Sequence, residues 1–339
     1  MASPCAKAWA PTALSYFTAS VSGILGILAT TGNLLIIAAV IKDPLKKLRT
    51  PFMYFLVNLA FSDLIVGCVT MPTSVVTHTL EAHGTKKRVH ATIIQLSYFM
   101  SSTASMLSLA TLCIDRYLAV RHPMSYRRRI TLSLCIAVSV VIWILSISLP
   151  FLFFVVGYMN YLMIFAHSAV VLTLIIIAFT YKNIYSILTS QAWKLRGARH
   201  SSAENLNVDP GVEASRTASE RHVVQVFLFI LCYVVICYVP AIICIYILRF
   251  CPKCDCNFRH VLRDLQFLFI VSNSCVNPFL CSIRLRPFRR AIIAMLGLSR
   301  FLDKSESAGE SNQKTGNTPE NSTPVSQQKL HLATVQKAT

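Results

Sequence analysis

Residues 51–77 read PFMYFLVNLAFSDLIVGCVTMPTSVVT, a predominantly apolar run in which Asp63 is the only charged residue. The hydrocarbon core of a bilayer is about 30 Å thick, so a helix that crosses it needs about 20 apolar residues. The run is therefore long enough to span a membrane. Because a carboxylate at membrane depth is costly and usually functional, Asp63 is also a candidate site residue.

Six further runs of the same kind occur along the chain. With the first, they cover roughly residues 18–41, 51–77, 91–120, 131–155, 161–189, 222–249 and 259–283. Seven such runs predict an all-α membrane protein, a seven-transmembrane helix bundle over residues 18–283. The first run is too long for a cleaved signal peptide, so we expect it to remain as a helix.

The composition agrees with a membrane protein. Of the 339 residues, 54% are apolar and only 14% are charged, whereas soluble domains carry roughly 25% charged residues. These values exclude a soluble globular enzyme. The net charge of +18 arises largely from basic residues that flank the apolar runs, so we expect the lipid bilayer as a partner and no nucleic acid.

Lysine and arginine residues are unevenly divided between the connections. Segments 42–49, 116–129, 182–221 and 284–337 hold 24 of the 32, and the alternate connections hold eight. Because basic residues stay on the cytoplasmic side, we expect a multi-pass plasma membrane protein with its N-terminus outside and its C-terminus in the cytoplasm. Residues 1–17 are then an extracellular N-terminus. Residues 190–220 and 303–339 lack apolar periodicity and are predicted to be a mobile cytoplasmic loop and a disordered tail.

Small polar residues lie at the same depth as Asp63 in other runs. They are Asn33, Ser105, Asn273, Ser274 and Asn277. Their oxygens, with the carboxylate, are suited to a small hard cation. The alternative is that they only hold helices together through hydrogen bonds worth about 1 kcal/mol each.

A second polar cluster is predicted at the cytoplasmic end of the third run. Asp115-Arg116-Tyr117 lies there, and Glu220 lies at the cytoplasmic start of the sixth run. An ion pair between Arg116 and Glu220 across the bundle would suit a bistable switch. The alternative is a charged anchor at a helix end.

Short motifs occur on all seven runs in a recognisable order and spacing. They are Gly32-Asn33, Leu59-Ala60-Phe61-Ser62-Asp63, Asp115-Arg116-Tyr117, Trp143, Tyr181, Cys237-Tyr238-Val239-Pro240 and Asn277-Pro278. Over about residues 18–297 the chain thereby resembles rhodopsin-like (class A) G-protein-coupled receptors. The resemblance implies a receptor, not an enzyme, that senses an extracellular ligand and activates heterotrimeric G proteins when helix 6 moves outward.

The resemblance also assigns site residues. It implies a G-protein switch made of Asp115, Arg116, Tyr117, Glu220, Tyr181, Asn277 and Pro278. It implies an allosteric sodium ion, and no other metal or cofactor, at Asp63, Ser105, Asn273 and Asn277. Residues 284–302, which contain Arg286-Pro287-Phe288, resemble the amphipathic eighth helix on the inner leaflet. Arrestin and receptor kinases are the partners implied for the Ser/Thr-containing tail.

The chain departs from the family at several positions. Ala91 replaces the helix-3 cysteine, Thr173 the helix-5 proline, Tyr238 the helix-6 tryptophan and Cys281 the helix-7 tyrosine. A short second outer connection over residues 157–160 and the Cys251-Pro252-Lys253-Cys254-Asp255-Cys256 stretch resemble the melanocortin branch, or the wider group with adenosine, cannabinoid and lysophospholipid receptors.

Four cysteines are predicted to lie outside the membrane. They are Cys5, Cys251, Cys254 and Cys256, and their even number predicts two disulfides. The melanocortin-like spacing suggests the pairs Cys251–Cys254 and Cys5–Cys256. A zinc site in this stretch is the alternative, and an oxidising compartment favours disulfides.

The outer half of the bundle is expected to hold the ligand. Its predicted lining residues are Gln95, Tyr98, Phe99, Ser102, Phe165, Ser168, Tyr238, Ile242, Phe267 and Ile270. This lining is largely apolar and neutral, which suits a lipid or another small neutral molecule. The seventh run contains no lysine, so a retinal Schiff base cannot form. The alternative is that the aromatic residues merely pack the core.

Other classes fit the sequence less well. A transporter or channel would show repeated halves, broken helices or pore-lining charge, which we do not find. His78, His83 and His90 near the first outer connection have no fixed acidic partner in the sequence, so they are interpreted as loop residues instead of metal ligands. An orphan or ligand-independent scaffold that heterodimerises remains the second interpretation, because Tyr238 and Cys281 lie on the family's activation path.

Overall fold

The computed structural model describes residues 5, 8–44, 46, 48–85, 88–201, 232–251, 253–284 and 286–295. All regular elements within these ranges are helical, which confirms the predicted all-α class. In chain order they are α1 (Thr12–Lys42), α2 (Pro51–Ile65), the π-helical turn η1 (Val66–Thr70), α3 (Met71–Ala82), α4 (Arg88–Arg121), α5 (Pro123–Arg129), α6 (Leu132–Ser148), the 3-10 turn η2 (Leu149–Phe151), α7 (Leu152–Val156), α8 (Tyr158–Phe165), the π-helical turn η3 (Ala166–Val171), α9 (Leu172–Ser201), the helix Cys232–Phe250, α11 (Cys256–Arg284) and α12 (Arg286–Met295).

Consecutive elements join into long rods. Six of the described rods are long and apolar enough to cross a membrane, namely Thr12–Lys42, Pro51–Ala82, Val89–Arg121, Leu132–Val156, Tyr158–Ile187 and Cys232–Phe250. The seventh predicted run, 259–283, lies within α11, whose 29 residues are also long enough. Gln266, Asn273 and Asn277 on its buried side lower its apolar content.

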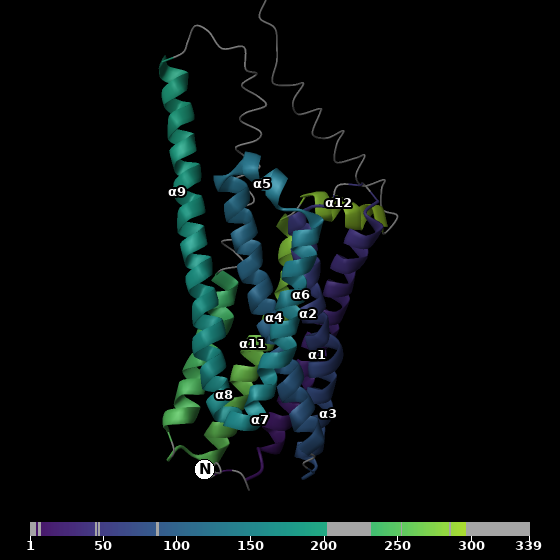
Figure 1. The fold of residues 1–339 in the computed structure, drawn as a ribbon. Coiled ribbons are helices and arrows are strands. Elements are labelled where there is room, and N and C mark those ends of the chain that lie inside the picture. Colours follow the sequence, from purple (N-terminus) through teal and green to yellow (C-terminus); the bar gives the residue numbers. More distant parts are fainter. Residues whose placement is uncertain are drawn as a thin grey trace, which may run out of the picture.

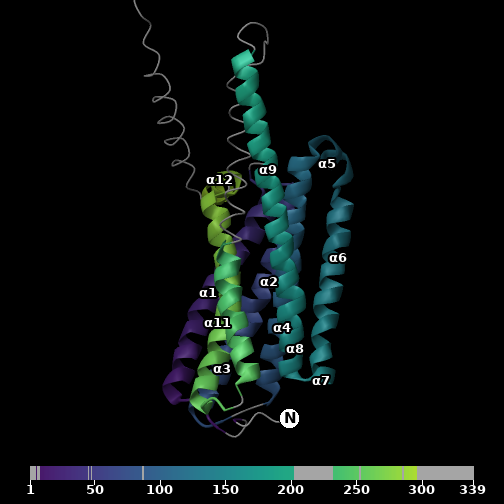
Figure 2. The ribbon, with the colours of Figure 1, turned by 90° about the vertical axis from the view of Figure 1, so that its left-hand side faces the viewer.

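The rods run side by side as a bundle (Figure 1). The start of α1, the turn between α7 and α8 and the start of α11 mark one end, which we call the N-terminal end. α5 and α12 lie at the opposite end, where α12 turns across the bundle axis in both views (Figures 1 and 2). α6 lies on the outside of the bundle in Figure 2.

Capping residues explain where several helices begin and end. Thr50 and Thr131 precede α2 and α6, and their side chains accept hydrogen bonds from the backbone N–H groups of Met53 and Leu134. α1 ends at Asp43, which adopts a left-handed conformation with φ 34°.

Large apolar side chains gather both inside the bundle and on its outer face. Phe99, Tyr238 and Leu162 are fully buried in the interior. Ile27 of α1 and Phe179 of α9 are exposed by 66% and 64%. A protein surface of this kind suits contact with lipid tails.

The structure corrects three predicted boundaries. The second outer connection, predicted over residues 157–160, is reduced to Gly157, because this glycine takes φ 82° and α8 begins at Tyr158. The predicted mobile loop 190–220 is helical up to Ser201, since the stretch contains good helix formers such as Gln, Ala, Lys and Leu. The helix predicted from residue 18 begins at Thr12.

α12 corresponds to the predicted amphipathic helix. Phe288, Ala291 and Ile292 are buried, whereas Arg289 and Arg290 are exposed. The described helix ends at Met295, so residues 296–302 of the prediction lie outside the described residues. The remainder of the predicted loop, 202–220, and the predicted tail, 303–339, lie outside them as well.

Candidate functional sites

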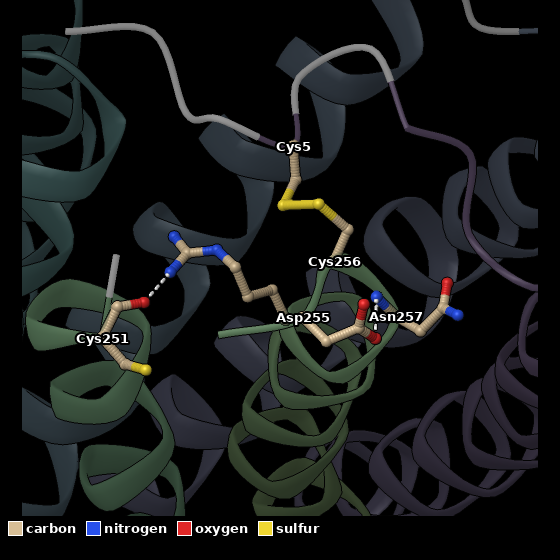
Figure 3. The surroundings of a disulfide bond; sticks show 6 residues. Cys5, Cys251, Asp255, Cys256 and Asn257 are labelled. Carbon is tan, nitrogen blue, oxygen red and sulfur yellow. Dashed lines mark hydrogen bonds between the residues drawn. A yellow bond between two sulfur atoms is a disulfide. The ribbon is translucent and has the colours of Figure 1, made fainter. Parts of the chain in front are cut away.

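Two disulfides close the N-terminal end of the bundle. Cys5 pairs with Cys256 (Figure 3). Cys251 pairs with Cys254, so both predicted pairings are confirmed. Asp255 caps the start of α11, because its carboxylate accepts the Asn257 backbone N–H at 3.0 Å. The Cys5–Cys256 disulfide fixes the N-terminal segment to the first residue of α11.

A cavity of about 320 Å³ lies near this end, between α3, α4, α8 and α11. Gln95, Tyr158, Gln266 and Phe267 form part of its wall. Of the ten residues predicted to line a pocket, only Gln95 and Phe267 are among those that surround it.

The other predicted pocket residues lie elsewhere. Six are in the interior packing of the bundle, namely Tyr98, Phe99, Ser102, Phe165, Tyr238 and Ile270, while Ile242 is partly buried against it. The rings of Phe99 and Tyr161, for example, meet edge to face at 4.6 Å. Ser168 is a correction, because it is exposed on the outer face and its hydroxyl donates to Ile164 of its own helix.

The cavity wall also contains a charged cluster that the sequence did not predict. Arg263 donates through Nε to Asp264 Oδ1 at 2.7 Å and through Nη2 to Glu81 Oε2 at 3.1 Å. Thr18 of α1 donates to Asp264 Oδ2 at 3.0 Å. His78 lies beside both carboxylates. The wall is thus more polar than the largely neutral pocket that we predicted.

A larger apolar hollow of about 700 Å³ lies between α2 and α6. Phe61, Ile136 and Ile144 contribute to its wall and are themselves exposed on the outer face of the bundle. Its place and composition suit lipid tails, and it is separate from the charged cluster.

The predicted polar cluster is assembled in the middle of the bundle. Asp63 is fully buried, and its Oδ2 accepts a hydrogen bond from Asn277 Nδ2 at 2.8 Å. Asn33 Nδ2 donates to the Ser274 carbonyl at 3.0 Å, which ties α1 to α11.

Several oxygens of this cluster have no hydrogen-bond partner among the described residues. They are Asp63 Oδ1, Ser105 Oγ, Asn273 Oδ1 and Asn33 Oδ1. Unpaired buried oxygens are costly and require an explanation. A carboxylate with hydroxyl and amide oxygens is a suitable donor set for a small hard cation, so these residues fit the predicted sodium ion.

α1 and α11 approach closely beside this cluster. A Cβ atom placed on Gly32 would lie 2.8 Å from Cβ and Cγ of Pro278, too close for any larger residue without a shift. Nearby, Trp143 Nε1 donates to Asn58 Oδ1 at 2.9 Å, and Asn58 Nδ2 donates to Ser108 Oγ at 2.8 Å. These contacts join the motif residues of separate helices into one core.

The arginine of the predicted switch, Arg116, lies near the C-terminal end of α4, at the other end of this helix from the cavity residue Gln95. Arg116 donates to Asp115 Oδ2 through Nε at 2.9 Å and through Nη2 at 2.5 Å. Tyr126 of α5 donates to Asp115 Oδ1 at 2.7 Å. The Arg116 guanidinium also lies over the Phe52 ring, with its central carbon 4.5 Å from the ring centroid.

The remaining switch residues are only partly described. Tyr117 and Tyr181 pack against the buried Ile184 of α9. Glu220, predicted to bind Arg116, lies outside the described residues. Tyr126 and Phe52 are the Arg116-cluster residues that sequence reasoning missed; the aromatic ring on a neighbouring helix gave no local signal.

Fold and clusters together define a multi-pass helical membrane protein with a polar centre and a paired arginine at one end. A profile of the 7 transmembrane receptor (rhodopsin family) matches residues 32–163 and 157–280. Adenosine receptor A3 of Ovis aries is 27% identical over 329 residues, which cover 90% of this chain and 96% of that receptor.

Because the profile matches well over half of its length, the chain belongs to the 7 transmembrane receptor (rhodopsin family). It is a class A G-protein-coupled receptor and not an enzyme, as the motifs predicted.

Proposed function

We propose that the chain is a plasma membrane receptor with its N-terminus outside, whose ligand binds the cavity near the N-terminal end and promotes nucleotide exchange on a G protein at the opposite end. The observation that carries this proposal is that α4 contributes to both sites. Gln95 lines the cavity, and Arg116, which is paired with Asp115, lies further along the same continuous helix. At 1.5 Å per residue these positions are about 30 Å apart, close to the thickness of a bilayer core.

The arginine cluster supports a switch mechanism. Asp115, Tyr126 and Phe52 hold Arg116 against the bundle. Outward movement of the helix Cys232–Phe250, with the segment before it, would open the G-protein side and let Arg116 leave these partners. Glu220 is proposed as a further partner from that segment. Tyr117, Tyr181, Asn277 and Pro278 complete the proposed switch.

The polar centre is proposed as a sodium site. Asp63, Ser105, Asn273 and Asn277 would hold the ion, and the unpaired oxygens of the first three support this assignment. When bound, sodium would balance the Asp63 charge and link α2, α4 and α11. A ligand shifts an equilibrium between two conformations only if it binds one of them more tightly. Sodium would therefore stabilise the helix packing in which these oxygens lie close together.

The cavity supports a small ligand that forms hydrogen bonds. Gln95, Tyr158 and Gln266 present uncharged polar groups beside the ring of Phe267. Glu81 and Asp264 already contact Arg263, so both carboxylates are engaged within the protein and do not require a cationic ligand. Adenosine receptor A3 carries a nucleoside in its name, which places nucleosides beside small lipids among the compounds to be tested.

Further partners are proposed for the cytoplasmic side. Arrestin and receptor kinases would bind the Ser/Thr-containing segment 303–339. A ligand-independent scaffold is the second candidate function. Tyr238 favours it, because this residue is buried in the core at the position where the family has the tryptophan of its activation path.

The test is a compound screen in cells that report each G-protein class. Epitope tags at the two ends would first verify that the N-terminus is stained on intact cells and the C-terminus only after permeabilisation. A compound that activates the parent should lose potency at least tenfold on Gln95→Ala and keep it on Ser168→Ala, because only Gln95 lines the cavity. Equal potency on both variants would place the ligand elsewhere, and activity in no G-protein class would favour the scaffold.

A further inference from the structure

His78 is a buried ionisable residue of the cavity wall that the proposed mechanism does not use. It lies on α3 and is 8% exposed. Its Nδ1 is buried and has no hydrogen-bond partner among the described residues. A buried imidazole nitrogen in this position requires an explanation.

Two buried carboxylates face this nitrogen from different helices. His78 Nδ1 lies 3.4 Å from Glu81 Oε2 on α3 and 4.0 Å from Asp264 Oδ2 on α11. Both carboxylate side chains are at most 5% exposed. Both separations are longer than a charge-assisted hydrogen bond, and the contact with Glu81 is the nearer of the two.

Other charged and polar groups also surround His78. Arg263 on α11 contacts both carboxylates and stays charged. α1 contributes the hydroxyl of Thr18, α8 the phenol of Tyr158 and α4 the amide of Gln95. The side chains of Lys86, Lys87 and Arg88 in the following connection lie outside those described.

We propose that His78, Glu81 and Asp264 form a binding site for an extracellular proton, in which the imidazolium bridges α3 and α11 through the two carboxylates. Histidine is the side chain that ordinarily changes charge between pH 5 and 8. The cavity lies at the N-terminal end, so under the proposed orientation its proton comes from the extracellular fluid. The location of the source rests on the proposed function, whereas proton binding itself does not.

Proton binding should change stability with a definite sign. A bound proton that strengthens contacts in the folded bundle stabilises it, so this contribution is present at low pH and disappears as pH rises. The unfolding midpoint of the parent should therefore rise by a few degrees as pH falls.

The experiment compares thermal unfolding of the full chain in lipid nanodiscs between pH 8.0 and pH 5.5. His78→Gln removes the titrating ring and keeps a polar side chain of similar reach. His83→Gln is the matched control, because His83 is exposed directly after the end of α3 and its Nδ1 bonds the Thr79 carbonyl. We expect the parent to unfold at a higher midpoint than His78→Gln at pH 5.5, and this difference should be about 3 °C larger than at pH 8.0. The midpoint of His83→Gln should follow that of the parent at both pH values.

A difference between parent and His78→Gln that stays constant over this pH range would overturn the proposal. If His78→Gln cannot be purified, Glu81→Gln provides the second test, because it neutralises the nearer carboxylate and should also reduce the pH-dependent part. An unchanged pH dependence in Glu81→Gln would overturn the proposal as well. The measurement needs no G protein, so failure of receptor signalling would leave it unaffected.

Discussion

Phe52 should hold Arg116 in its paired arrangement through its aromatic ring. The guanidinium carbon lies 4.5 Å from the ring centroid. The Arg116 side chain is 20% exposed and Phe52 is 8% exposed. Cation–π contacts contribute about 0.5 kcal/mol when exposed and about 2 kcal/mol when desolvated, so about 1 kcal/mol is reasonable for this partly buried pair.

Phe52→Leu keeps an apolar side chain and removes the ring. A loss of about 1 kcal/mol from the resting arrangement changes its equilibrium constant roughly fivefold. We therefore expect ligand-free G-protein signalling to rise roughly fivefold per receptor at the cell surface, because a receptor that rests mostly inactive responds in proportion to this constant.

The assay is second-messenger output normalised to surface expression. Phe52→Tyr retains a ring and should behave like the parent. Phe55→Leu removes a second buried ring of α2 and controls for lost packing, because among the described residues the ring under the guanidinium is that of Phe52. Equal ligand-free signalling in Phe52→Leu and Phe52→Tyr would refute the argument that the ring restrains Arg116.

Three further predictions concern packing, sodium and the disulfide. Gly32→Ala should lower the unfolding midpoint by several degrees, because its Cβ would lie 2.8 Å from Pro278. Gly23→Ala on the same helix should not lower it, because its Cβ would lie 3.8 Å from the nearest atom. Equal midpoints for the two variants would show that the α1–α11 contact adapts easily to the added methyl group. Raising sodium at constant ionic strength should reduce ligand-free signalling in the parent and not in Asp63→Asn, and a variant as sensitive as the parent would place the ion elsewhere. Cys5→Ser should expose the Cys256 thiol to a membrane-impermeant maleimide on intact cells, and labelling no greater than that of the unreduced parent would argue against the tether.

Hydropathy and short motifs were sufficient to predict the helices and the polar centre. The apolar runs are local features, so their count follows from the sequence, and Asp63, Ser105, Asn273 and Asn277 could be placed at one depth by their position within each run. The disulfide pairing came from spacing that resembles a known branch of receptors, and the structure has the same pairs.

Contacts between distant residues could not be predicted in the same way. Glu81 and Arg263 are 182 positions apart, so their contact depends on the three-dimensional arrangement of α3 and α11. Phe52 read as one more apolar residue of its run, since nothing local indicates that its ring meets Arg116. The extent of α9 was missed because membrane hydropathy does not report helix propensity beyond the bilayer.

Nucleotide exchange on purified G proteins is the most direct test of the arginine switch. The receptor would be reconstituted without ligand, and the parent, Asp115→Asn and Asp115→Asn/Arg116→Ala would be compared with receptor-free vesicles. Asp115 accepts both hydrogen bonds that Arg116 donates to a carboxylate. Removing its charge should therefore raise exchange several-fold over the parent, and the double variant should fall to the level of receptor-free vesicles. Exchange by the double variant as fast as that of Asp115→Asn would contradict the account, because the activating group would then not be Arg116.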